Sequence, residues 1–99
     1  MRVRWTRPAL QDLGGIRAYI AEDNPRAAQK TASLLKQASR QLARFPRLGR
    51  RGTATGSREL IVSGTSYILI YDIEQDEVRV TAVVHGATDW KEGEEPRLA

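Results

Sequence analysis

The spacing of hydrophobic residues divides the chain into helical and extended segments. Residues 2–6 alternate between polar and apolar, which predicts a short first strand. Apolar residues at helical spacing follow and predict a helix over residues 8–22. Asn24 and Pro25, a good N-cap and a good first helical residue, then begin a second helix of about 20 residues that stops before Pro46. Because so few residues join the two helices, they are expected to form an antiparallel hairpin.

The second half of the chain has the period of β-strands. A basic, glycine-containing loop over residues 46–56 precedes three predicted strands, over residues 58–62, 67–73 and 78–85. The middle strand is apolar on both faces, so we expect it to be central in a sheet. In the last strand, alternation places four residues on one face: Val78, Val80, Ala82 and Val84.

The order of these elements predicts an α+β fold. An N-terminal strand and an antiparallel helical hairpin would pack with a three-stranded antiparallel meander. The 99 residues are enough for a single domain, with residues 91–99 as a mobile tail. Gly14 and Gly15 lie inside the first predicted helix, where each costs about 1 kcal/mol relative to alanine. They either permit a close helix–helix approach or are simply tolerated.

Charge is distributed unevenly along the chain. The net charge is +4 and the isoelectric point is about 10.0. Residues 24–58 contain no acid and nine bases, and this segment predicts an acidic or polyanionic partner. The alternative is an ordinary solvated helix face, but such surfaces usually mix both signs of charge. The nine bases are Arg26, Lys30, Lys36, Arg40, Arg44, Arg47, Arg50, Arg51 and Arg58.

Several classes of protein are excluded by composition. The chain has no cysteine and one histidine, so we expect no disulfide, no thiol chemistry and no metal site. No nucleophile elbow, phosphate-cradling glycine loop or other cofactor motif is present, so no cofactor is expected. The basic N-terminus has no apolar run behind it and no apolar segment is long enough for a membrane span. We therefore expect a cytoplasmic protein.

Metal-free cleavage of RNA is the main catalytic possibility to weigh. It requires a base, an acid and cations near the developing phosphorane charge. His85 is a candidate acid or base and Arg58 and Arg79 are candidate cations, if they converge on the sheet face away from the helices. Glu59 is a second candidate base, but alternation places it on the opposite face from Arg58. His85 alone fits three roles: a structural residue at a strand end, a binding contact or a catalyst.

The arginines of the basic loop give a stronger indication of function. Arg47, Arg50 and Arg51, together with Arg58, are expected to contact the phosphates or carboxylates of a target. Solubility is the alternative explanation for these charges.

Six sequence motifs, taken in order, cover nearly the whole chain. They are "W-T-x-x-A-x-x-D-L-x-x-I-x-x-Y-I" (5–20), "E-D-N-P-x-A-A" (22–28), "L-x-x-F-P-x-L-G-R-x-G" (42–52), "G-S-R-E-L-I-V" (56–62), "Y-I-L-I-Y-D-I" (67–73) and "V-V-H-G-A-T-D-W" (83–90). In this order they resemble the RelE/ParE superfamily of toxins from type II toxin–antitoxin modules. The fold of that superfamily has the element order predicted above.

The resemblance implies two alternative targets. Some members of the superfamily cleave mRNA on the ribosome, whereas ParE-like members stabilise the cleaved-DNA complex of DNA gyrase. The ribonuclease members carry an arginine early in the central strand, where this chain has Ile68 or a neighbour, and no base lies between Glu59 and Asp76. The chain therefore resembles the ParE-like, plasmid-stabilisation branch, with no chemistry of its own expected. An mRNA endonuclease using His85 with Arg58 or Arg79, and an inactive member that only binds its antitoxin, are the alternatives.

The resemblance also implies a protein partner. Toxins of this superfamily are neutralised by an antitoxin whose disordered, acidic C-terminal segment folds over the toxin. An acidic segment would suit the acid-free basic stretch, and an apolar groove along the helices would suit folding on binding. We therefore expect a hetero-oligomer with the antitoxin, through contacts at Ile16, Tyr19, Ile20, Leu35 and Arg40.

Overall fold

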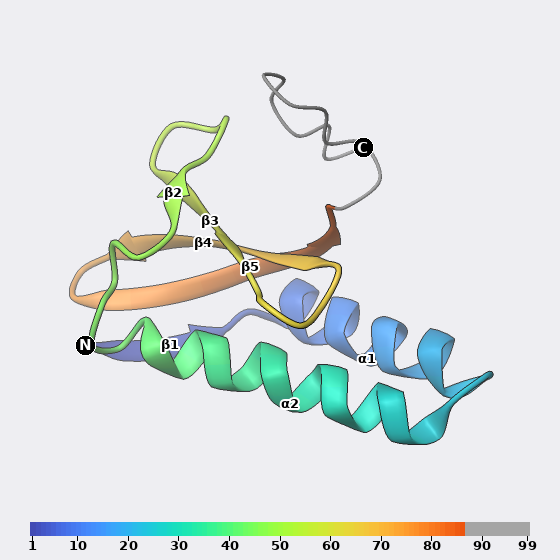
Figure 1. Ribbon diagram of the computed structural model, residues 1–99. Coiled ribbons are helices and arrows are strands. Elements are labelled where there is room, and N and C mark those ends of the chain that lie inside the picture. The colour runs from blue at the N-terminus through green and yellow to red at the C-terminus, as the bar shows by residue number, and fades with distance from the viewer. Residues whose placement is uncertain (87–99) are drawn as a thin grey trace.

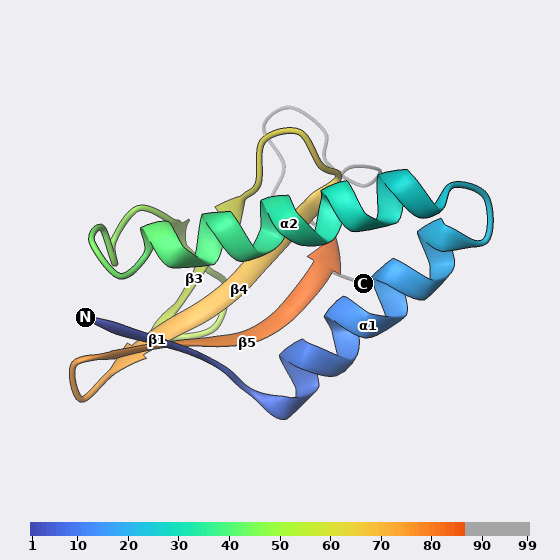
Figure 2. The same ribbon diagram turned by 90° about the horizontal axis from the view of Figure 1, so that it is seen from below.

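The computed structural model describes residues 1–86 and consists of two layers, a helical hairpin and a five-stranded sheet (Figure 1). Its elements are β1 (Arg2–Trp5), α1 (Arg7–Ala21), α2 (Pro25–Gln41), β2 (Arg50–Arg51), β3 (Ser57–Ile61), β4 (Tyr67–Glu74) and β5 (Glu77–His85). Both helices lie against the same face of the sheet (Figure 2), which confirms the predicted α+β arrangement. The tail predicted over 91–99 lies outside the described residues. Within residues 1–86, neither helix is long and apolar enough to span a membrane.

Side-chain caps define where both helices begin. The Thr6 hydroxyl oxygen accepts a hydrogen bond from the Ala9 N–H at 3.3 Å, and the Asn24 carboxamide oxygen accepts one from the Ala27 N–H at 3.0 Å. Each helix also has a proline in its first turn. The missing N–H is harmless there, because the first N–H groups of a helix have no intrahelical acceptor. The predicted starts of the two helices are therefore confirmed to within a residue.

The end of α2 differs from the prediction. The helix ends at Gln41, whereas the apolar pattern extended it almost to Pro46. Beyond Gln41 the backbone winds more tightly, and the Leu42 N–H donates to the Ser39 carbonyl at 3.0 Å. Such i→i+3 bonds satisfy carbonyls that would otherwise have no partner. Leu42 is fully buried, so its side chain continues the helical hydrophobic pattern although the backbone has already left the helix.

The sheet has the order β1-β5-β4-β3-β2, so β4 is the central strand, as its apolar faces predict. β1 pairs in parallel with β5, and all other neighbours are antiparallel. Parallel pairing requires a long crossover, and here the chain passes through both helices before it returns as the sheet. The edge position of β1 could not be predicted, because a strand of four residues carries no information about its partner.

A β-bulge changes which residues of β5 face the helices. The β4–β5 register shifts beside Tyr71 and leaves Thr81 without an opposite residue. A bulge of this kind reverses the alternation of side chains beyond it. Val83 therefore joins the buried cluster, with 5% exposure. The prediction for this strand is correct for Val78 and Val80 and wrong for Ala82 and Val84.

The glycine pair in α1 does not mediate a close contact. A Cβ added at Gly14 or Gly15 would meet no heavy atom within 4 Å. Both residues are exposed. The two glycines are therefore tolerated rather than required by packing between the helices.

Trp5 connects the edge strand β1 to the helical layer. Its indole N–H donates to the Ser39 hydroxyl at 3.1 Å, and that hydroxyl donates to the Lys36 carbonyl at 2.7 Å. Trp90, the last residue of the motif over residues 83–90, lies outside the described residues. The buried cluster between the layers consists of Ala9, Leu13, Ala32, Leu35, Leu42, Val62, Leu69, Tyr71, Val78, Val80 and Val83.

Candidate functional site

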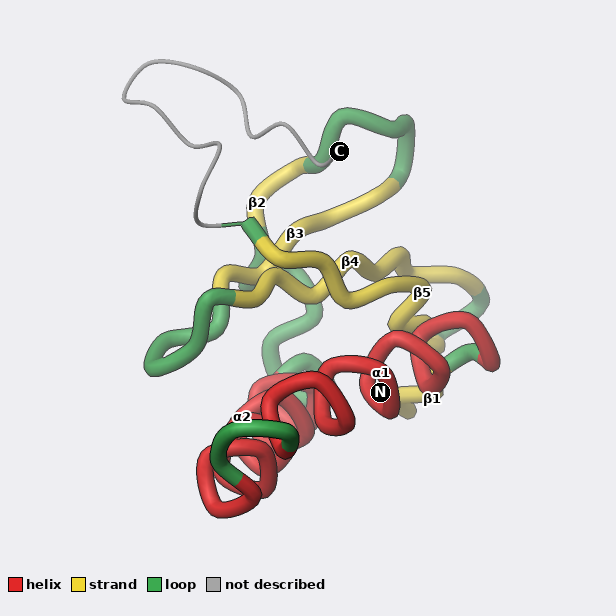
Figure 3. The backbone as a smooth tube through the Cα atoms, turned by 90° about the vertical axis from the view of Figure 1, so that its right-hand side faces the viewer, coloured by secondary structure: helices red, strands yellow, loops and turns green. Residues whose placement is uncertain are grey.

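One hollow at the β2 edge of the sheet is lined by three of the four arginines that were predicted to contact a target. This hollow has a volume of about 490 Å³ and is lined by Arg47, Arg51 and Arg58, together with residues 52–57 and Ile73. Arg51 and Arg58 are directly opposite each other in the β2–β3 pair, so both side chains lie on one face of it. Figure 3 shows the connection between β2 and β3 projecting away from the helices.

The short strand β2 corrects the prediction of a loop over residues 46–56. Arg50 and Arg51 pair with β3, and the Gly52 N–H donates to the Ser57 carbonyl at 2.8 Å. Gly56 has a φ of 82°, a backbone conformation that favours glycine and that turns the chain back into β3. Two residues are too few for a hydrophobic period, so only the pairing with β3 reveals this strand.

Tyr71 holds the segment that leads into the hollow. This residue of the central strand is fully buried, and its hydroxyl donates to the Pro46 carbonyl at 2.8 Å and accepts from the Gly49 N–H at 2.9 Å. Arg58 Nη1 donates to the Gly49 carbonyl at 2.8 Å. A Cβ at Gly49 would lie 2.8 Å from both the Tyr71 ring and the Glu59 carbonyl oxygen, so only glycine fits this approach. Burial raises the pKa of Tyr71, while the Gly49 hydrogen bond and the Arg58 charge oppose the shift.

Arg50 is separated from the other three arginines. It lies opposite Glu59, and its Nη2 forms an ion pair with Glu59 Oε1 at 3.2 Å. Glu59 is only 4% exposed, and a buried carboxylate of this kind needs such a partner. Because neighbouring residues of a strand point to opposite faces, Arg50 and Arg51 have different surroundings.

The structure does not bring the alternative catalytic residues together. β4 lies between the two strands that carry these residues. His85 of β5 lies opposite Tyr67 of β4, and Arg58 of β3 lies opposite Tyr71 of β4. Tyr67 and Tyr71 are four residues apart, which separates the two positions by roughly 13 Å along the strand. Both tyrosines face the helices, whereas the prediction placed His85, Arg58 and Arg79 on the face away from them.

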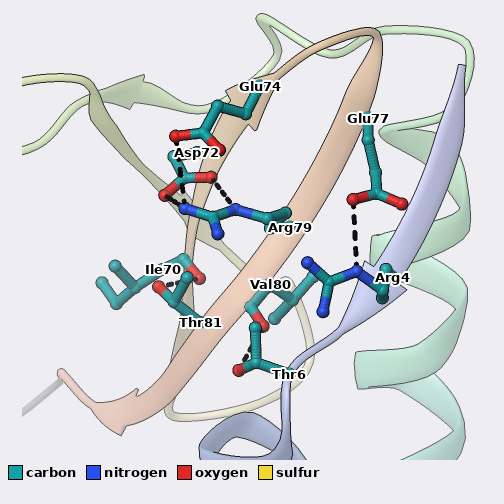
Figure 4. A network of polar contacts seen from close by, with 9 residues as sticks. All are labelled: Arg4, Thr6, Ile70, Asp72, Glu74, Glu77, Arg79, Val80 and Thr81. Carbon is teal, nitrogen blue, oxygen red and sulfur yellow. Dashed lines mark hydrogen bonds and ion pairs between the residues drawn. The ribbon is translucent and has the colours of Figure 1, made fainter.

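Arg79 lies on the opposite face of the sheet and is already engaged (Figure 4). Its Nε and Nη2 each donate to one carboxylate oxygen of Asp72 at 2.9 Å, and Glu74 lies 3.6 Å from Nη2. The hydrogen bonds that Arg79 donates to Asp72, reinforced by the charge of that carboxylate, raise the pKa of Arg79 above its ordinary value. Two carboxylates therefore oppose any role of this arginine as a free cation for a phosphate.

His85 stands at the exposed end of β5 beside an aromatic residue. Its ring meets the Tyr67 ring edge-on, with 5.3 Å between the centroids and an interplanar angle of 87°. Burial, and then the neighbouring Tyr19, raise the pKa of Tyr67. Of the three interpretations of His85, this contact fits a structural residue at the end of a strand.

A second hollow, between β1 and the helical hairpin, contains one of the predicted antitoxin contacts. Its volume is about 280 Å³, and Arg40 lies on its lining. Sequence reasoning missed Leu10, which is 54% exposed, and named Lys36 only as one of the nine bases, although it places a second base beside Arg40. Leu10 falls three residues before the buried Leu13, a spacing that already indicated the same side of α1. The full lining is Val3, Trp5, Leu10, Leu13, Lys36, Ser39 and Arg40.

The other predicted antitoxin contacts differ in accessibility. Leu35 is fully buried in the core, so it offers no surface to a partner in this structure. Tyr19 is 72% exposed, whereas Ile16 and Ile20 are half-buried. A hydrophobic stripe on a helix cannot separate the residues that face the core from those at the edge of a groove, because both recur with the same period.

A third hollow, of about 350 Å³, lies between α2 and β3. Leu48 and Ile61, which are 51% and 57% exposed, contribute to its lining. Sequence reasoning did not identify it, because its residues come from segments that only tertiary packing brings together.

The fold and these surfaces define a small basic α+β protein in which three arginines share a hollow at one sheet edge and a groove beside the helices lies at the other. The chain belongs to the ParE toxin family of type II toxin–antitoxin systems, of the parDE type, whose sequence model matches residues 3–90.

Individual relatives agree with this assignment. The chain is 38% identical over 89 residues to "Putative toxin Y4kP" of Sinorhizobium fredii, covering 90% of this chain and 92% of that protein. It is 42% identical over 86 residues to "Toxin RelE2" of Caulobacter vibrioides, covering 87% of this chain and 96% of that protein. The chromosomal ParDE toxin–antitoxin system of P. aeruginosa contains a chain of similar fold, with a TM-score of 0.74, 22% identity and coverage of 84% and 92% of the two chains. The protein is therefore a type II toxin of the RelE/ParE superfamily.

Proposed function

We propose that this toxin acts by stabilising the cleaved-DNA complex of DNA gyrase and that it performs no chemistry itself. The observation that carries the proposal is the placement of its charged groups. Three arginines share one hollow, while the single histidine lies elsewhere on the sheet. A protein that binds a DNA-bearing target needs clustered cations, and it does not need an acid–base pair beside them.

The same placement argues against an RNA-cleaving toxin. Cleavage through the 2′-hydroxyl of RNA would require an acid, a base and cations within reach of one phosphate. His85 and Arg58 are well apart, and Arg79 is held by carboxylates on the other face. The central strand β4 carries no base, so no other residue of this strand replaces the missing cation.

We also propose that a cognate antitoxin neutralises the toxin through the hollow between β1 and the helices. The lining of this hollow combines apolar side chains such as Leu10 with the bases Lys36 and Arg40. An acidic segment that folds on binding would bury apolar residues against Leu10 and place carboxylates beside the two bases. Among the predicted contacts, Arg40 and the exposed Tyr19 are retained, whereas Leu35 is not.

The decisive experiment compares the two targets directly. Purified protein is incubated with gyrase, ATP and supercoiled plasmid, then treated with detergent and protease, and linear DNA is quantified. In parallel, the protein is added to translating ribosomes and mRNA cleavage is mapped by primer extension. We expect linear DNA and intact mRNA. Cleaved mRNA without trapped linear DNA would overturn the proposal and establish the endonuclease, and inactivity in both assays would also overturn it.

A further inference from the structure

We propose that Arg47, Arg51 and Arg58 form a phosphate-binding pocket that grips the sugar–phosphate backbone of DNA. The inference rests on the proposed function for its biological setting, although phosphate binding is measurable without gyrase. The volume of about 490 Å³ lies within the range of roughly 300–1,000 Å³ typical of ligand sites.

Three arginines on the strands of the sheet are paired with carboxylates. Arg4, Arg50 and Arg79 each form an ion pair with a carboxylate, at 3.1, 3.2 and 2.9 Å. Within residues 1–86, no carboxylate pairs with Arg47, Arg51 or Arg58, and none lines their hollow. The fold therefore neutralises Arg4, Arg50 and Arg79 but leaves the positive charge of the three arginines in the hollow for a ligand.

The pairing of β2 with β3 provides a second, independent indication of an anionic ligand. Arg51 lies directly opposite Arg58, with both side chains on the same face. Like charges at such positions repel each other and destabilise a pair of strands. The nearby carboxylate of Glu59 does not relieve this repulsion, because it lies on the other face and pairs with Arg50. An anion bound between the two guanidinium groups would relieve it.

The rest of the lining suits a phosphate. Arg58 already donates Nη1 to the Gly49 carbonyl, which holds the guanidinium in place and leaves others of its five N–H donors for a ligand. Planar guanidinium groups bind phosphate oxygens with two parallel hydrogen bonds. Hydroxyl-bearing residues complete the wall of the hollow, and they are Thr53, Thr55 and Ser57.

An acidic antitoxin segment is the competing anion, and the topology disfavours it. The groove with Lys36 and Arg40 involves β1, at one edge of the sheet, whereas the arginine hollow involves β2, at the opposite edge. The two surfaces can therefore serve two partners, with protein bound at the β1 edge and nucleic acid at the β2 edge.

The test measures binding of a fluorescent 20-base-pair DNA duplex to the whole protein at several salt concentrations. Arg51→Ala and Arg58→Ala are compared with Arg17→Ala, which removes the same charge from an exposed position on α1. For each pocket arginine we expect weaker binding and a log–log salt slope smaller in magnitude by about 1. Arg17→Ala should leave the slope unchanged. Equal losses in all three variants would mean diffuse attraction and would overturn the pocket.

Two further measurements make the inference independent of folding and of gyrase. Inorganic phosphate should raise the melting temperature of the wild type more than that of Arg51→Ala, and Arg51→Ala without phosphate should melt no lower than the wild type. Arginine-dependent binding of polyglutamate but not of DNA would overturn the pocket as a phosphate site. If the wild type traps gyrase-cleaved DNA and both variants do so equally, the pocket fails while the proposed function stands. If DNA binding depends on the arginines but no gyrase-cleaved DNA is trapped, the function fails while the pocket stands.

Discussion

Replacing Tyr71 with phenylalanine tests how the basic segment is held. The substitution removes one oxygen atom and keeps the aromatic ring, so it leaves no cavity large enough to affect packing. It deletes two hydrogen bonds, at 2.8 Å to the Pro46 carbonyl and at 2.9 Å from the Gly49 N–H. Because Gly49 is buried while Pro46 is half-buried, the Gly49 N–H cannot easily regain a partner from water.

The expected loss of stability follows from these two contacts. A buried donor without an acceptor costs about 1–3 kcal/mol, and an exchanged hydrogen bond costs about 1 kcal/mol. The Tyr71→Phe change should therefore reduce the free energy of unfolding by about 2–4 kcal/mol, a large part of the roughly 5–15 kcal/mol available to a typical domain. The midpoint of urea unfolding should fall by about 1–2 M, with an unchanged m-value.

Urea titrations followed by circular dichroism provide the measurement, and Tyr19→Phe is the matched control. Tyr19 is 72% exposed, so loss of its hydroxyl should change stability by less than about 0.5 kcal/mol. Equal midpoints for the two variants would refute the conclusion that the Tyr71 hydroxyl holds the Pro46 and Gly49 backbone. A lower m-value in Tyr71→Phe would indicate that the variant alters the native or denatured ensemble instead.

Three other predictions follow from the fold. Gly14→Ala should stabilise the protein by about 0.5–1 kcal/mol, because helix propensity improves and the added Cβ meets no atom within 4 Å; a lower urea midpoint would contradict this. Leu35→Ala should cost about 2–5 kcal/mol, since the side chain is fully buried, and any loss of antitoxin binding should follow the unfolded fraction measured by circular dichroism. Burial raises the pKa of Tyr67 and Tyr71 above 10.0 in the folded state, so the unfolded state loses protons first and stability should fall as the pH rises above 10. Urea midpoints from pH 8 to 11 measure this fall, which should be smaller in Tyr71→Phe, and a constant midpoint would contradict it.

The local signals in the chain determined most of the architecture. Hydrophobic period, the helix start at Asn24 and Pro25, and the apolar faces of β4 predicted both helices, four of the five strands and the central position of β4. These features depend on interactions between residues close in sequence, or on whether one segment is buried, and a one-dimensional pattern contains that information. The family also followed from the motifs.

Only the tertiary structure decided how segments far apart in the sequence lie relative to one another. The bulge at Thr81 reversed which side chains of the last part of β5 face the helices. Pairing with β3 made a short strand of Arg50 and Arg51 and gave the two arginines different partners. Leu35 is buried in the core, although its position in the helical hydrophobic pattern also fits a residue at the edge of a groove. Each outcome depends on strand register or on contacts between layers, which are collective properties of the packed chain. The sequence by itself therefore determined the basic stretch, and the packing decided which of its arginines share a hollow.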